Sequence, residues 1–198
     1  MKRTPIRFLS VTLVVVALLG LSCFAQAAPP VVKTVPWVAS NPLIPHDTWS
    51  GKQITLKGTS DMQGATITYI WDFGDGSPSA TGTVTNQYVV EATHTYTGTT
   101  GTVYAARLTI TNTATSESAS KEYYVKMQDK SLAVETNRAI DEGLWYLHKT
   151  QYRYSSGGVN YGNWASGSGY ATSGYYGISG LNTNAFEVNG HLESGPAD

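Results

Sequence analysis

The feature that most constrains the fold of this chain is a series of short segments in which polar and apolar residues alternate. Residues 53–57, 66–71 and 122–127 belong to this series, and turn residues separate them. Alternation with a period of two indicates strands with one buried face, and several such strands in succession indicate a sandwich or a barrel. No segment of residues 31–127 keeps a helical period over three turns. We therefore predict that this region is an all-β domain.

The segment 102–111 is the longest of these predicted strands. Its expected buried residues are Val103, Ala105, Leu108 and Ile110. These positions do not keep one parity, so we expect the inward face of the strand to shift near Ala106.

The first 27 residues have the three parts of a secretory signal peptide. Three basic residues (Lys2, Arg3 and Arg7) precede an apolar run over residues 8–24, and Ala25-Gln26-Ala27 follows. We predict cleavage after Ala27, and therefore a secreted or cell-surface protein. Two alternatives are a membrane anchor, for which the run has about the minimum length, and lipidation at Cys23, which Gly20 disfavours because it stands where a large aliphatic residue is expected.

Charge and cysteine content exclude several classes of site. Without the three basic residues of the signal peptide, 10 basic residues face 14 acidic ones, so the mature chain lacks the positive patch that nucleic acid or anionic lipid requires. The lone Cys23 provides neither a disulfide nor a thiolate metal site. Charged residues make up only 14% of the chain and hydrophobic residues 41%, a balance that argues against wholesale disorder.

The segment Trp71-Asp72-Phe73-Gly74-Asp75-Gly76-Ser77 has the features of a strand that ends in a tight turn. A tryptophan at the strand end can fill the space between two sheets. Glycines supply positive φ, and aspartates accept hydrogen bonds from turn amides. We therefore predict that Trp71 is a core residue and that the turn is structural.

This turn, with His94-Thr95-Tyr96 and the strand Leu108-Thr109-Ile110-Thr111-Asn112, resembles the PKD domain. The resemblance implies an immunoglobulin-like antiparallel β-sandwich over residues 28–127, and it departs from the family pattern only at 105–107. PKD domains occur as accessory modules of surface-layer proteins, collagenases, chitinases and other exoenzymes. The residues that carry the resemblance are Trp71, Asp72, Phe73, Gly74, Asp75, Gly76, His94 and Tyr96.

The two aspartates of the turn leave two interpretations open. Asp72 and Asp75 can cap turn amides, or they can provide hard oxygen ligands for calcium, the one cofactor that the sequence suggests. Acid–base catalysis is disfavoured, because the two carboxylates lie three residues apart on one tight turn. His94 is expected to pack near the turn, since no nucleophile stands beside it in a catalytic arrangement.

Residues 128–198 change character and predict a short α-helical, Gly/Tyr-rich segment. Asp129 or Ser131 can cap a helix over 131–149. Its predicted apolar face consists of Ala133, Thr136, Ile140, Leu144 and Leu147. Eight glycines in residues 157–180 and seven tyrosines in 146–176 predict a packed, irregular loop. A second helix is expected over 183–189, with Asn184 and Glu187 as a capping box and Gly190 as its terminator.

This segment also resembles, more loosely, one repeat of the α/α toroids of terpene cyclases and prenyltransferases. The resemblance rests on Ala139-Ile140, Gly143-Leu144-Trp145-Tyr146-Leu147, Gln151 and Gly162-x-Trp164, although ten residues separate Gln151 from Gly162, more than in that family. The Asp-rich cyclase motifs are missing, and His148 and His191 are isolated. Because repeat folds need several units, we expect 128–198 to be the incomplete start of such a domain, whose helix awaits further repeats, docks on the sandwich, or meets another copy of the chain.

The sequence therefore predicts a secreted or cell-surface, non-catalytic module that binds or spaces an extracellular protein or polysaccharide. Low charge and aromatic residues such as Trp37 and Trp49 suit such contacts. No catalytic residue and no nucleic-acid partner is predicted. The alternative is an accessory domain joined to the start of an extracellular α/α-toroid enzyme.

Overall fold

The computed structural model of the chain describes residues 29–61, 65–85, 88–157, 159–164 and 173–188. The predicted signal peptide lies outside the described residues, as do Gly190 and His191. Among the described residues, no helix is both long and apolar enough to cross a membrane.

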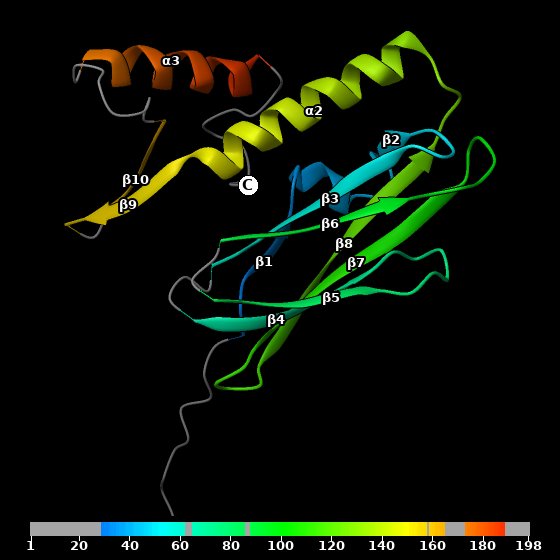
Figure 1. Cartoon of the computed structure of the whole chain (residues 1–198), viewed down its shortest axis with the longest axis horizontal. Helices are drawn as coiled ribbons and strands as arrows, with labels where there is room; N and C mark the ends of the chain where they lie inside the picture. The colour runs from blue at the N-terminus through cyan, green and yellow to red at the C-terminus, as the bar shows by residue number, and fades with distance from the viewer. Residues whose placement is uncertain (1–28, 62–64, 86–87, 158, 165–172, 189–198) are drawn as a thin grey trace, which may run out of the picture.

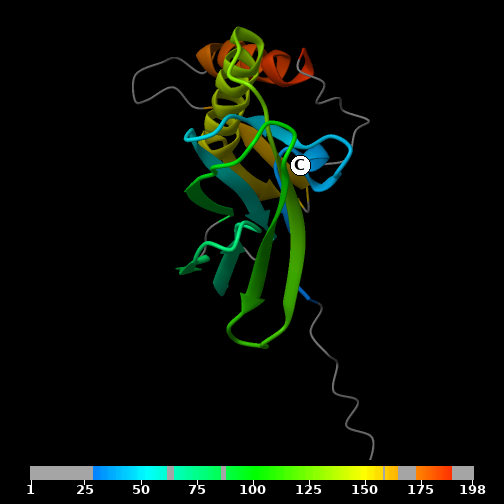
Figure 2. The ribbon, with the colours of Figure 1, turned by 90° about the vertical axis from the view of Figure 1, so that its right-hand side faces the viewer.

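The described part of residues 29–127 forms two packed β-sheets (Figures 1 and 2). The three-stranded sheet has the order β1-β3-β6, with β1 at Val32–Thr34, β3 at Gln53–Ser60 and β6 at Val89–Thr95. The five-stranded sheet has the order β2-β8-β7-β4-β5, with β2 at His46–Thr48, β8 at Ser118–Met127, β7 at Val103–Asn112, β4 at Thr66–Asp72 and β5 at Ala80–Thr85. A short 3-10 helix, η1 (Trp37–Ser40), follows β1. This is the predicted immunoglobulin-like sandwich, and of its described strand pairs only β2–β8 is parallel.

The core lies between the two sheets and is built from the inward residues of each strand. Trp71 is fully buried, as predicted, and its ring meets the edge of Tyr123 at 6.1 Å between centroids. Gly58 of β3 lies directly beneath this pair, since a Cβ there would come within 3.2 Å of the Trp71 ring and within 2.3 Å of Leu108. The other large buried side chains are Ile54, Leu56, Ile67, Val90, Tyr96, Ile110, Val125 and Met127.

The predicted parity shift in β7 is wrong. Ala106, Leu108 and Ile110 are fully buried on one face of the strand, which is the uninterrupted alternation of a regular strand. Val103 is 44% exposed and Ala105 is also exposed. These two residues therefore lie on the outward face, although their apolar character led to the prediction that they are buried.

The helix predicted after the sandwich is α2 (Leu132–Thr150), and Ser131 is its N-cap. The hydroxyl of Ser131 accepts a hydrogen bond from the amide of Val134 at 3.4 Å. The structure realises one of the alternatives open for this helix, since α2 packs on the sandwich beside β3, β6 and β2 (Figures 1 and 2).

The face of α2 that meets the sandwich is not the predicted apolar face. Arg138 and Trp145 are the buried residues of the helix. Of the five residues of the predicted face, Leu144 and Leu147 are half-buried, whereas Ala133 and Thr136 are exposed and Ile140 is 40% exposed. The prediction was wrong because it assumed that the apolar residues of the helix are buried, whereas the outer surface of the three-stranded sheet presents charges to the helix.

The chain after α2 is more regular than predicted. A hairpin of β9 (Tyr152–Ser156) and β10 (Val159–Asn163) stands where we expected an irregular loop. The next helix, α3 (Ser173–Glu187), is 15 residues long and starts before the predicted boundary. Asn184 therefore lies inside the helix, where its carbonyl accepts from the amide of Val188, and it does not begin a capping box.

The hairpin closes the C-terminal end of α2 by satisfying its last carbonyl groups. The indole of Trp164 donates to the carbonyl of Leu147 at 2.7 Å. The guanidinium of Arg153 donates to the carbonyl of His148 at 2.7 Å, and the Thr150 hydroxyl donates to that of Tyr146 at 2.7 Å. The end of the helix is therefore fixed by its own last residue, Thr150, and by Arg153 and Trp164, which follow it in the chain.

Candidate functional site

The turn that ends β4 holds both aspartates of the predicted motif. One carboxylate oxygen of Asp72 accepts from the amide of Gly74 at 3.0 Å. One oxygen of Asp75 accepts from both the amide and the hydroxyl of Ser77, at 3.0 and 2.5 Å. Gly74 has φ of +72°, and a Cβ there would lie 2.3 Å from the Ala105 carbonyl oxygen, so only glycine fits. Both carboxylates thus support the local backbone.

His94 and Tyr96 on β6 join this turn to the three-stranded sheet. The His94 ring stacks on Phe73 with 3.9 Å between centroids, and its Nε2 lies 2.7 Å from the second carboxylate oxygen of Asp75. The Tyr96 hydroxyl donates to the Phe73 carbonyl at 3.0 Å. Burial raises the pKa of Tyr96, and the Asp75 charge adds to this effect. These residues lie together as the sequence motif indicates.

The ionisation of Asp75 is set by opposing effects. Burial works against its charged form, but hydrogen bonds from the Ser77 hydroxyl, the His94 ring and the Ser77 amide outweigh burial and hold the pKa of Asp75 below its usual range. Among the described residues, no three His, Cys, Asp or Glu side chains are grouped closely enough to hold a metal ion. The contacts of the two carboxylates that the structure describes are with the turn and with His94, and calcium binding stays a prediction.

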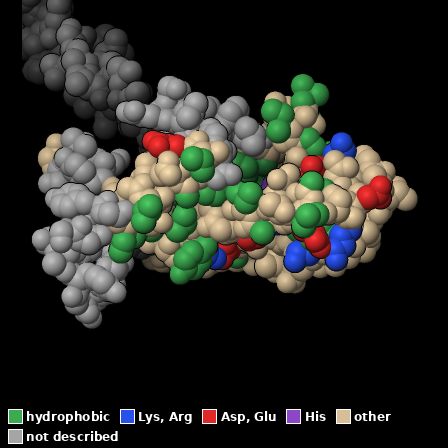
Figure 3. Space-filling view, turned by 90° about the horizontal axis from the view of Figure 1, so that it is seen from above, with side chains coloured by type: hydrophobic (Ala, Val, Ile, Leu, Met, Phe, Trp, Pro, Cys, Tyr) green, Lys and Arg blue, Asp and Glu red, His purple; other side chains and the backbone are tan. Residues whose placement is uncertain are grey.

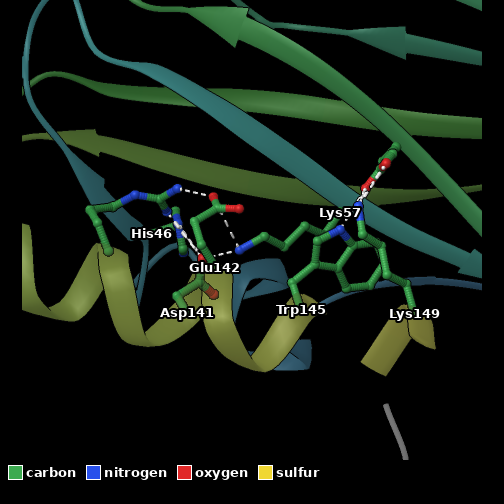
Figure 4. Close-up of polar contacts among 8 residues, drawn as sticks. His46, Lys57, Asp141, Glu142, Trp145 and Lys149 are labelled. Atoms are coloured by element: carbon green, nitrogen blue, oxygen red, sulfur yellow. Dashed lines mark hydrogen bonds and ion pairs between the residues drawn. The ribbon is translucent and has the colours of Figure 1, made fainter. Parts of the chain in front are cut away.

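A second polar site lies where α2 crosses the three-stranded sheet, and the sequence did not indicate it. Lys57 of β3 and Glu91 of β6 are directly opposite each other in the strand register. Both are outward positions, because Leu56 and Val90 beside them fill the core. Each of the two charges pairs with α2 (Figure 4).

Lys57 is fully buried beneath the helix, and its ammonium contacts the carboxylate of Asp141 directly. The second carboxylate, Glu142, lies 3.6 Å from the same nitrogen. Arg138 binds both carboxylates, at 3.2 Å to Asp141 and 2.6 Å to Glu142. His46 of β2 completes the group, with Nε2 at 3.3 Å from Asp141. We call these five residues the Lys57 cluster.

Burial dominates the ionisation of the Lys57 cluster. It lowers the pKa of Lys57, although Asp141 and Glu142 act in the opposite direction. It raises the pKa of Asp141 against the effects of Lys57 and Arg138, and it lowers the pKa of His46 well below its usual value, with Arg138 and Lys57 adding to that shift. Perturbed groups of this kind gather at functional sites and also in structural ion-pair networks.

Glu91 is the centre of a smaller contact at the other side of the helix. One oxygen accepts from the indole of Trp145 at 2.6 Å, and Lys149 lies 3.2 Å from the other oxygen. Trp145 is 3% exposed, and it stacks on His148 with 5.2 Å between ring centroids. Trp145 is thus the anchor that fixes α2 to β6, and His148 is part of this packing.

An open groove follows the flank of α2 over β3 and β6. One part, of about 560 Å³, is lined by Thr55, Glu91, Ala92, Thr93, Glu142, Trp145, Tyr146 and Lys149. The other, of about 510 Å³, shares Thr55, Thr93 and Glu142 and adds Trp49, Lys52, Gln53, Ile54, Lys130, Glu135, Arg138 and Ala139. The shared lining residues place the two parts next to each other along the helix.

The groove has an aromatic residue toward each end and mixed charges between. Tyr146 is 61% exposed, and Trp49 is half-buried, with the ammonium groups of Lys52 and Lys130 each 5.6 Å from its ring. Figure 3 shows acidic and basic side chains interspersed on the face seen from above, with no patch of one sign. The side chain of Trp37, the other predicted contact residue, lies outside the described residues.

The comparisons with known proteins concern the sandwich. A family model described as PKD domain matches residues 42–127, which confirms the resemblance seen in the turn and strands. Among solved structures, the chain is similar to the PKD domain of an M14-like peptidase from a Thermoplasmatales archaeon, with 21% identity and a TM-score of 0.38. That similarity covers 51% of this chain and 94% of the other. No curated protein matches the chain in sequence, and the resemblance of residues 139–164 to a toroid repeat stays a prediction.

Proposed function

Because residues 42–127 of this chain match the PKD-domain family model, we propose that the protein is an exported, non-catalytic module that binds a polysaccharide chain in the groove beside α2. PKD domains are non-catalytic modules of extracellular proteins. The predicted signal peptide over residues 1–27 supports export.

The observation that carries this proposal is that two hollows lie next to each other along one helix and share Thr55, Thr93 and Glu142. These two parts of the groove follow α2 from Trp49 to Tyr146 and are open to solvent along the helix. An open groove suits a linear polymer, whereas small ligands are held in enclosed pockets that bury most of their surface.

The chemistry of the lining also favours sugars. Sugar hydroxyls both donate and accept hydrogen bonds, and the groove provides hydroxyls (Thr55, Thr93), an amide (Gln53) and charges of both signs. Aromatic side chains combine a flat apolar body with a polar tip, and Tyr146 presents such a ring at the rim. Since the charges alternate in sign, we expect neutral polysaccharides to bind better than strongly anionic ones.

The test is binding of the exported chain to an array of neutral and anionic glycans and to insoluble polysaccharides, with matched tyrosine variants. Tyr146→Ala should weaken retention on the preferred glycan at least several-fold. Tyr152→Ala is the control, because Tyr152 is also 61% exposed but lies on β9, outside the groove lining. Loss of binding in Y146A but not in Y152A supports the groove, and equal loss in both, or no glycan retained by the wild type, contradicts the proposal.

A further inference from the structure

The Lys57 cluster brings an amine and a carboxyl group together beneath α2, where the lysine side chain is closed off from solvent. Lys57 lies on β3 and Asp141 on α2, 84 positions later in the chain, and their polar atoms are in direct contact. The side chain of Lys57 has no exposed surface, and that of Asp141 is 17% exposed. A lysine is almost never fully buried without a strong partner.

The charges around the pair allow it to be neutral. Arg138 and Glu142 form the shorter of the two ion pairs that Arg138 makes, at 2.6 Å, and therefore balance each other. His46 is buried, so it favours its uncharged form. The charges of Lys57 and Asp141 then remain. Moving one proton from the ammonium to the carboxylate makes both groups neutral, which a low-dielectric site favours.

We propose that Lys57 and Asp141 condense into an intramolecular amide bond that ties α2 covalently to β3. The neutral amine Nζ attacks the carboxyl carbon Cγ of protonated Asp141. The Nζ–Cγ bond forms, one Cγ–O bond breaks, and the oxygen leaves as water with two protons. Nothing is oxidised or reduced, and no co-reactant is needed.

Glu142 is placed to carry the protons of this step. Its carboxylate lies 3.6 Å from Nζ, close enough to accept a proton from the attacking amine after a small movement and to deliver it to the departing oxygen. Arg138 and His46 lie 3.2 and 3.3 Å from an Asp141 oxygen. Arg138 can therefore stabilise the negative oxygen of the tetrahedral intermediate, as donors in an oxyanion site do.

The fold supplies the proximity that an amine and an acid lack in bulk water. Well-oriented groups of one molecule react as though present at an effective concentration of about 10⁵–10⁸ M, and the fold holds Nζ of Lys57 against the carboxylate of Asp141. The Lys57 side chain is fully covered, which limits the contact of the amine with water. Such a bond would hold the C-terminal segment on the sandwich under conditions in which an ion pair breaks.

The experiment is peptide mapping of the folded, purified chain by mass spectrometry. Trypsin cannot cleave after an acylated lysine, so the bond predicts a branched species in which peptide 53–107 is joined to peptide 139–149 and is lighter than their sum by one water. The unlinked chain gives peptides 53–57, 58–107 and 139–149 instead. Finding only these three in the folded wild type would overturn the proposal and leave the contact an ion pair.

Three variants make the result specific. Lys57→Arg keeps the positive charge but cannot form the amide, so the branched species should vanish. Asp141→Asn should still give the same branched peptide, since its amide group can lose ammonia in place of water, and its failure to link would contradict the chemistry proposed. Glu142→Gln should lower the linked fraction at least tenfold, and an E142Q chain linked as fully as the wild type would overturn the role given to Glu142.

Discussion

The turn after β4 and the Lys57 cluster both hold buried or half-buried carboxylates, but they obtain their partners in different ways. Asp75 accepts from Ser77, two residues later in the chain, and in the described part of the chain its distant partner is His94. Asp141 meets Lys57 across 84 positions and His46 from a third element. The difference teaches that a local hydrogen-bonded motif can be recognised in a sequence, whereas an interface of single charges cannot.

The two sites also differ in what their removal should cost. The turn sits at the edge of the hydrophobic core, in contact with Phe73 and Tyr96, so its loss acts on the whole sandwich. The Lys57 cluster lies between α2 and the sheet, so its loss should act first on the docking of the helix. The predictions below test this division, beginning with the largest expected effect.

Trp71→Ala should have the largest effect. Truncating a buried tryptophan typically costs about 3–5 kcal/mol, which is comparable to the free energy of unfolding of a small domain, and Trp71 is fully buried between the sheets. We expect the sandwich to lose its cooperative thermal transition. An unchanged melting temperature, measured by circular dichroism, would mean that Trp71 is not the core of the domain in solution.

Asp141→Ala should release α2 without unfolding the sandwich. The variant removes the carboxyl group to which Lys57 is paired and, on the proposal above, bonded. Leaving a buried lysine without its partner costs about 3–5 kcal/mol unless the structure opens to let the charge out. The structure can open here because α2 can leave the sheet, which exposes the Lys57 ammonium to water. Hydrogen exchange should therefore become fast over residues 132–150, while the amides of β3, β4, β7 and β8 stay protected.

Glu135→Ala is the matched control for this experiment. It removes the same charge from the same helix, but Glu135 pairs with Lys130 at an exposed position, where such a pair is worth about 0–1 kcal/mol. Protection of 132–150 that is equally high in D141A and E135A would contradict the role of the Lys57 cluster as the docking site.

The sandwich could be predicted from the sequence because its signals repeat along the chain. Alternation fixes which face of a strand is buried, and the Trp71–Ser77 turn identifies the family by its local chemistry. The short strands β1 and β2 have only three residues each, too few for a period to be seen. The inward face of β7 was wrongly predicted where apolar Val103 and Ala105 stand on its exposed side.

The docking of α2 could not be predicted, because its signal is spread over three elements. Lys57 and Glu91 are ordinary outward residues of an alternating strand until the helix covers them. Arg138, Asp141 and Glu142 are ordinary polar residues of a helix until they meet the sheet. The one usable hint is Trp145, an aromatic residue on the otherwise polar face of α2.

Asp75→Asn should have an intermediate effect that depends on pH. Hydrogen bonds to a charged group contribute about 1.5–3 kcal/mol, so we expect a loss of that order at neutral pH. The pKa of Asp75 is lowered in the folded state, so the stability that it provides is present above its unfolded pKa of about 3.9 and is lost as the pH falls through the folded pKa.

Denaturant unfolding between pH 7 and pH 2 measures this effect. The wild type and D75N should differ most at neutral pH and converge as the pH drops below about 4. Asp72→Asn is the control, since Asp72 lies on the same turn but accepts from the Gly74 amide and has no bond to His94 among the hydrogen bonds described. A difference between wild type and D75N that stays constant down to pH 2 would contradict the assignment.

Ile140→Ser should have the smallest effect, and it tests the orientation of α2 directly. Ile140 is the centre of the apolar face that the sequence predicts to be buried, yet it is 40% exposed. Surface substitutions usually change stability by about 0.5 kcal/mol or less, so the melting temperature and the exchange of residues 132–150 should hardly change. Ile67→Ser is the matched comparison, because Ile67 is 1% exposed in the core and its loss leaves both a cavity and a buried hydroxyl. An I140S chain as unstable as I67S would mean that the apolar face of α2 is covered in solution, and that the helix meets its partner through both faces.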